Sequence, residues 1–203
     1  MSLIRANFFV ACLCVLSACG DATLPLSPLA PGARVLAFGD SLTAGNGASA
    51  TESYPAVLAE LAVLNVVNAG VSRELSRSGL ERLPALLAQH QPQLVILCHG
   101  GNDLLRSTGK SAAKANLMAM IDLVHAQGAD VMLLGVPEPG VFLSAAEFYD
   151  EVATETGVAY LPDLISDVLQ RPSLKSDAVH PNAAGYRLIA EGVYEYLHDA
   201  EAI

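Results

Sequence analysis

Ser41, Asp177 and His180 are residues whose chemistry would combine into a nucleophilic site if the fold brought them together. A serine hydroxyl is a weak nucleophile until a base removes its proton, and the base works best when a carboxylate fixes its tautomer. Among the histidines, His180 is the one that follows an acidic residue by three positions in a loop punctuated by Pro181 and Asn182. Each residue also has a structural interpretation, because Ser and Asp are preferred at helix N-termini. Local sequence alone does not separate catalysis from capping.

Acyl transfer also requires hydrogen-bond donors for the oxyanion that forms when the nucleophile attacks a carbonyl group. Asn102, within the segment Gly100–Asp103, can supply a side-chain N–H, and its neighbouring glycines let the backbone approach a substrate closely. The same segment also reads as an ordinary turn. Ser41 is not in a G-x-S-x-G elbow, since Thr43 stands where the second glycine would be. This departure argues against an α/β-hydrolase.

Alternating strands and helices are predicted to position these residues. Short apolar runs predict strands at 34–38, 63–67, 94–98, 131–134 and, weakly, 158–161. Helical spacing occurs around 55–61, 80–90, 112–127, 143–156 and 183–197. Such alternation is typical of a parallel sheet with helices on both faces, so we expect a three-layer α/β domain with about five strands.

Functional residues of parallel sheets gather after the carboxyl ends of the strands. Ser41 follows the first predicted strand, and Asn102 follows the third. The segment after the fourth strand contains the apolar residues Val136, Pro137 and Phe142, which we interpret as a wall of an acyl pocket or simply as a connector. The predicted strand ends therefore place the polar and apolar parts of one site at the same edge.

Three blocks in the chain resemble, in order, those of the GDSL, or SGNH, hydrolase family. They are Gly39-Asp40-Ser41-Leu42, Gly100-x-Asn102-Asp103 and Asp177-x-x-His180. The similarity spans most of 34–198, and the stretch GLERLPALLAQHQPQLV resembles the TesA-type thioesterase, arylesterase and lysophospholipase branch. The resemblance implies a flavodoxin-like sheet and hydrolysis of esters or thioesters through an acyl-enzyme, without metal or cofactor.

The same resemblance assigns roles to individual residues. Ser41 would be the nucleophile, His180 the general base and acid, and Asp177 the residue that orients His180. The backbone N–H of Ser41 and the side chain of Asn102 would be oxyanion donors. Asp40 and Asp103, which adjoin these residues, are interpreted as groups that stabilise turns.

One block departs from the family pattern. Where the family has N-x-G-x-S-G-x-T-S, this chain has NAGVSRELS, so that Gly70 matches but Arg73 replaces the second glycine. Any residue except proline has a backbone N–H, and our hypothesis is that Arg73 supplies the remaining oxyanion donor through its main chain. Gly70 is the alternative donor. The Arg73 side chain would narrow the site or contact an anionic group.

The N-terminus has the sequence pattern of an export signal. Arg5 precedes an apolar run and then small residues, a pattern typical of a secretory signal and too short for a permanent span. The segment Leu16-Ser17-Ala18-Cys19 resembles a bacterial lipobox, so we expect a signal peptide at 1–18, lipidation of Cys19, a tether at 19–33 and one hydrolase domain at 34–203. The alternatives are an ordinary signal peptide cleaved nearby or an uncleaved one.

Composition limits the classes of ligand and partner that we expect the protein to bind. The formal net charge of −10 over 203 residues, without a cluster of Lys and Arg, argues against nucleic-acid binding. No pair of histidines shows metal-ligand spacing. Cys98 is left as the one cysteine of the predicted domain, which excludes a disulfide within it, and it is interpreted as a small buried apolar residue.

The predicted partners are therefore a small ester or thioester and, through Cys19, a membrane on the periplasmic face of the cell envelope. The oligomeric state stays open. A carbohydrate O-deacetylase using the same residues is the alternative enzyme. The alternative from another class is a lipid-anchored binding protein, which predicts a disrupted triad.

Overall fold

The computed structural model describes residues 26–138, 140 and 143–203. Its centre is a parallel sheet of five strands in the order β2-β1-β3-β4-β5. This order is that of flavodoxin-like, doubly wound sheets, so the predicted fold class is confirmed. The strands are β1 (Arg34–Gly39), β2 (Asn65–Gly70), β3 (Leu94–Cys98), β4 (Asp130–Leu134) and β5 (Ala159–Leu161).

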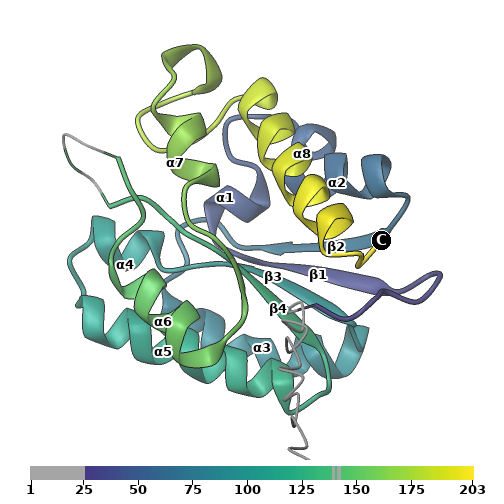
Figure 1. Ribbon diagram of the computed structural model, residues 1–203. Coiled ribbons are helices and arrows are strands. Elements are labelled where there is room, and N and C mark those ends of the chain that lie inside the picture. Colours follow the sequence, from purple (N-terminus) through teal and green to yellow (C-terminus); the bar gives the residue numbers. More distant parts are fainter. Residues whose placement is uncertain (1–25, 139, 141–142) are drawn as a thin grey trace, which may run out of the picture.

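Helices cover both faces of the sheet (Figure 1). One face carries α2 (Tyr54–Ala62) and α8 (Ala183–Asp199), with α7 (Leu164–Leu169) packed against α8. The other carries α3 (Ser76–His90), α5 (Lys110–His125) and α6 (Phe148–Thr156), which pack side by side. Because both faces are covered, β3 is buried along its whole length, which explains why it reads as an unbroken apolar run.

Two buried tyrosines connect the helical layers to loops at the carboxyl ends of the strands. The hydroxyl of Tyr149, on α6, donates to the carbonyl oxygen of His99 at 2.7 Å. The hydroxyl of Tyr186, on α8, donates to the carbonyl oxygen of Asn46, also at 2.7 Å. Buried hydroxyls need such partners, so these bonds fix the loops that follow β1 and β3 relative to the helices.

Several element boundaries differ from those predicted, and two of the differences have a clear structural cause. The second strand was expected at 63–67, but Val63 ends α2 in the left-handed conformation with φ 53° and is 91% exposed. Its apolar run therefore straddles a turn, and β2 begins at Asn65. The helix expected from residue 143 begins at Phe148, because the chain before it pairs with the loop after β4 through a bridge between Pro137 and Ala145.

Part of the predicted tether contacts the domain. Leu26 is 5% exposed within the core, and the N–H of Ser27 donates to the carboxylate of Asp130. The N–H of Leu29 donates to the carbonyl oxygen of Ala202 at 2.9 Å. Residues 26–33, assigned from sequence to the tether, thus pack at the amino ends of the strands. The predicted signal peptide and Cys19 lie outside the described residues. Over the described ranges, no helix is both long and apolar enough to cross a membrane.

Candidate active site

Ser41 is the first residue of a short helix, α1 (Ser41–Ala44), which starts directly after β1. Asp40 caps this helix, because its Oδ1 accepts a hydrogen bond from the N–H of Leu42 at 3.1 Å. The turn requires Gly39, since a Cβ there would collide with the carbonyl oxygen of Cys98. Ser41 is only 8% exposed, and its N–H is one of the helix-terminal donors without an intrahelical acceptor.

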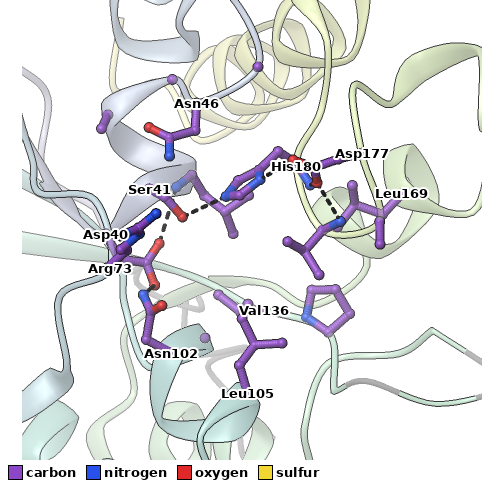
Figure 2. Close-up of a pocket in the computed structure, with 18 of the residues that line it drawn as sticks. Asp40, Ser41, Asn46, Arg73, Asn102, Leu105, Val136, Leu169, Asp177 and His180 are labelled. Carbon is purple, nitrogen blue, oxygen red and sulfur yellow. Dashed lines mark hydrogen bonds and ion pairs between the residues drawn. The ribbon is translucent and has the colours of Figure 1, made fainter.

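The imidazole of His180 lies between the Ser41 hydroxyl and the Asp177 carboxylate (Figure 2). His180 Nε2 is 2.9 Å from Ser41 Oγ, and His180 Nδ1 is 2.7 Å from Asp177 Oδ2. The other carboxylate oxygen, Oδ1, accepts from the N–H of Val179 and of His180. Burial raises the pKa of Asp177, but the hydrogen bonds from His180 and from these N–H groups outweigh it and lower the pKa. Asp177 is therefore an anion that can hold Nδ1 protonated, leaving Nε2 to accept a proton from Ser41.

Hydrogen bonds join the two ends of the loop that carries Asp177 and His180. The N–H of Ser176 donates to the carbonyl oxygen of His180 at 3.0 Å, and Lys175 forms a bridge with Pro181. The next residue, Asn182, caps α8 by accepting from the N–H of Gly185 at 3.1 Å. The carboxylate and the imidazole are thus built into one rigid turn at the start of the last helix.

Asn102 lies on a short helix after β3, α4 (Gly101–Leu105). Gly100 precedes it with φ 102°, a conformation that favours glycine. Asn102 Nδ2 donates to Asp40 Oδ2 at 3.1 Å, and the residue is 7% exposed. An amide nitrogen carries two hydrogens, so this bond leaves the second one available to a ligand. The segment predicted as a turn or an oxyanion donor is therefore the start of a helix beside Ser41.

Arg73 is the third residue of a β-turn. The N–H of Glu74 donates to the carbonyl oxygen of Val71 at 3.2 Å, and Arg73 has φ 66°. A positive φ at this position, without one at Ser72, is the geometry of a type II turn, which usually places glycine there. An arginine in this conformation costs about 1 kcal/mol. Within the part of the chain that the structure describes, no group accepts from the Arg73 N–H, and Arg73 lines the same cavity as Ser41.

Gly70 has a different position from the one that an oxyanion donor needs. Its N–H donates to Asn68 Oδ1 at 3.0 Å, and it is absent from the described lining of the cavity. A Cβ at Gly70 would collide with the backbone of Ala44, so this glycine allows α1 to pack closely on the end of β2. The geometry therefore disfavours Gly70 as the alternative donor.

Asp40 and Asp103 stabilise turns, as expected. Burial raises the pKa of Asp40, and the positive charge that His99 carries when protonated and the hydrogen bond from Leu42 offset this only in part. Asp103 accepts from the N–H of Ser76 at 2.8 Å and from its hydroxyl at 2.9 Å. It thereby fixes the start of α3.

A cavity of about 980 Å³ opens at Ser41 and is lined by both polar and apolar side chains. Val136 and Pro137, two of the three residues suggested as a pocket wall, line this cavity, whereas Phe142 lies outside the described residues. Sequence reasoning missed other apolar lining residues, among them Leu105, Leu143, Leu169 and Val179. Leu105 follows Asn102 by one helical turn, a spacing that could have identified it. Figure 2 shows Val136 and Leu105 together on one side of the hollow, below His180 in this view.

Cys98 is fully buried, and burial raises the pKa of its thiol well above the ordinary value. Its expected role as a small apolar residue agrees with this position. Among the residues that the structure describes, no three His, Cys, Asp or Glu side chains form a group that could hold a metal ion.

Comparison with known proteins places residues 37–188 in the GDSL-like lipase/acylhydrolase family model. The chain is 34% identical over 171 residues to thioesterase 1/protease 1/lysophospholipase L1 of Escherichia coli K12, covering 80% of this chain and 82% of that protein. It is 32% identical over 183 residues to esterase TesA of Pseudomonas aeruginosa, covering 85% and 91%.

Solved structures give the same picture. A crystal structure of TesA superposes with a TM-score of 0.75 at 31% identity, covering 82% of this chain and 99% of the other. The psychrotrophic esterase EstA from Pseudoalteromonas sp. gives a TM-score of 0.72 at 26% identity, covering 82% and 97%.

Proposed function

Since this chain belongs to the GDSL-like lipase/acylhydrolase family and is an ester-hydrolysing serine hydrolase, we propose that Ser41, His180 and Asp177 are its catalytic triad. The observation that carries the proposal is the continuous hydrogen-bonded chain from Asp177 through His180 to Ser41. These two hydrogen bonds also argue against a non-catalytic binding protein, in which nothing would require the three side chains to stay hydrogen-bonded to one another.

The proposed reaction has two acyl-transfer steps. His180 Nε2 takes the proton of Ser41 as Oγ attacks the carbonyl carbon, and Asp177 stabilises the imidazolium that forms. His180 then protonates the leaving group, which yields an acyl-enzyme on Ser41. In the second step, His180 removes a proton from water as the water oxygen attacks the acyl carbon. His180 then returns the proton to Ser41 Oγ as the bond between Oγ and the acyl carbon breaks, and the acid leaves. The N–H groups of Ser41, Arg73 and the Asn102 side chain would stabilise the oxyanion in both steps.

The proposed substrates are small carboxylic esters or thioesters with an apolar acyl chain, of the arylesterase, thioesterase or lysophospholipase type. The apolar side chains at the cavity supply a surface for such a chain. The apolar side chains among these lining residues favour a longer acyl chain over the acetyl group that a carbohydrate O-deacetylase would remove. The names of the bacterial relatives support the same substrate classes.

A panel of p-nitrophenyl esters and acyl thioesters of increasing chain length tests this substrate class, with acetylated sugars included. We expect activity to rise with chain length beyond acetate and to require Ser41. A sharp preference for an acetylated sugar would contradict this substrate class and favour carbohydrate O-deacetylase activity instead. A fluorophosphonate that forms no adduct on Ser41 in the folded protein would favour the binding protein.

We also propose that the protein is exported and anchored to the periplasmic face of a bacterial membrane through acylated Cys19. The support is the sequence pattern that ends at Cys19, outside the described residues. Expression in a bacterium fed an alkyne-tagged fatty acid tests the proposal. We expect label on the wild-type protein and none on Cys19→Ser, and equal labelling of both would overturn it.

A further inference from the structure

Glu74 is a buried carboxylate directly after the turn that contains Arg73. Its side chain is only 7% exposed. Arg82 Nε donates to Glu74 Oε1 at 2.7 Å, and Arg82 Nη2 donates to Oε2 at 2.8 Å. His99 Nε2 lies 3.1 Å from the same Oε2. The carboxylate is therefore held from both sides, as a buried charge must be if it is not to destabilise the fold.

Arg82 connects this carboxylate to the ends of two strands. Its Nη2 also donates to the carbonyl oxygens of Ala69 at 2.7 Å and of Gly39 at 3.3 Å. Its guanidinium lies 4.2 Å above the ring of Phe38. The position of Glu74 is thereby fixed relative to β1, which leads directly to Ser41, and to β2.

His99 connects the same carboxylate to the segment that carries Asn102. The N–H of Gly100 donates to His99 Nδ1 at 3.0 Å, so the neutral imidazole carries its proton on Nε2, facing Glu74. The ring is fully buried and packs against Gly79, where a Cβ would collide with it. His99 can therefore move little without moving Glu74.

Two further residue pairs join the segments 71–76 and 99–106 through hydrogen bonds. Arg106 Nη2 donates to the carbonyl oxygen of Arg73 at 3.1 Å. Asp103 accepts from both the N–H and the hydroxyl of Ser76. These two segments carry the two proposed oxyanion donors other than Ser41, and three connections hold them together along their length.

We propose that Glu74, held by Arg82 and His99, is a positioning residue that keeps the turn at 71–74 in the conformation that presents the Arg73 N–H to the oxyanion. The inference rests on the proposed function. Arginine, unlike glycine, prefers a negative φ, and a change of φ at Arg73 would reorient the adjoining peptide groups. The buried carboxylate ties the residue after Arg73 to two strands and to His99, and so opposes that change.

A double-mutant cycle tests this role. Glu74→Gln is made in the wild type and in Arg73→Gly. In the second background, glycine adopts the positive φ at position 73 without the support of Glu74. In the wild type we expect kcat on p-nitrophenyl butyrate to fall about tenfold with KM nearly unchanged, because an oxyanion donor acts mainly in the transition state. In the Arg73→Gly background the same change should lower kcat by less than about threefold.

Glu81→Gln is the matched control, because Glu81 also pairs with an arginine on α3, Arg77, but both side chains are exposed. Equal losses of kcat from Glu74→Gln in both backgrounds, or a loss no larger than in Glu81→Gln, would overturn the proposal. If Glu74→Gln does not fold, His99→Leu must show the same suppression by Arg73→Gly. Ser41→Ala distinguishes failure of the proposed triad from failure of this inference. Activity that persists in Ser41→Ala refutes the triad. If Ser41→Ala is inactive but Glu74→Gln keeps the wild-type kcat, only the role of Glu74 is refuted.

Discussion

Asp40 Oδ2 and Asn102 Nδ2 lie 3.1 Å apart, although the two residues follow different strands, β1 and β3. An ionised carboxylate only accepts hydrogen bonds, so it sets which end of the Asn102 amide faces Asp40. The residue before the proposed nucleophile therefore fixes the orientation of a proposed oxyanion donor. The turn that carries the Ser41 hydroxyl therefore also orients the Asn102 amide.

Ser41→Ala should lower kcat on p-nitrophenyl butyrate by about three orders of magnitude or more, as loss of a triad nucleophile does. The fold should be unaffected, because Asp40 supplies the side-chain cap of α1. Steady-state kinetics and thermal unfolding of the same preparation check both expectations. Retention of most of the wild-type kcat would exclude Ser41 as the nucleophile.

Asp177→Asn should lower kcat by about two to four orders of magnitude while KM changes little. The amide can still meet His180 Nδ1, but it no longer stabilises an imidazolium or selects the tautomer with Nε2 free. Kinetics at saturating ester measure the effect. A loss smaller than tenfold would mean that the half-exposed carboxylate has only a structural role.

Asn102→Ala should lower kcat by about 10²–10³, since one preorganised donor is removed from the oxyanion. Arg73→Ala should lower it less, because the proposed donor at this position is the backbone N–H, which alanine keeps. Both variants are compared on the same neutral ester. A larger loss from Arg73→Ala would assign the function of this residue to its guanidinium.

Leu105→Glu should lower kcat/KM for long acyl esters about tenfold more than for acetate, because a carboxylate would contact the acyl chain. Leu105 is 50% exposed at the cavity, so the substitution should leave the folding stability nearly unchanged. Ile203→Glu is the control, since Ile203 is an exposed apolar residue away from the cavity lining. Equal losses across chain lengths would place the acyl chain elsewhere.

Glu74 should make folding stability depend on pH in the acid range. Burial raises its pKa, but hydrogen bonds from His99 and Arg82 outweigh this and lower the pKa below the ordinary 4.5. The resulting stabilisation is present above 4.5 and is lost as the pH falls through the pKa of the folded state. The difference in unfolding free energy between wild type and Glu74→Gln should therefore shrink on acidification, which urea titrations measure. A constant difference would show that Glu74 is not ionised in the fold.

The strands and the polar blocks after them could be predicted because both depend on local patterns. The run Leu94–Cys98 is apolar throughout because helices cover both faces, and Asn102 follows it directly. Val63 was misassigned because an apolar residue in a left-handed turn looks like the start of a strand. The contacts of Glu74 with Arg82 and His99 had no local signal, since they join a turn, a helix and a strand end.

Ser27, near the start of the described residues, donates its N–H to Asp130, the first residue of β4, whereas the cavity lies at the opposite ends of the strands. Six residues lie between Cys19 and Leu26, so the two are at most about 25 Å apart along a fully extended chain. If Cys19 is acylated as proposed, the amino ends of the strands are held close to the bilayer. The opening of the cavity then faces the aqueous space. It would then meet esters arriving from solution more readily than lipids of the leaflet that holds it.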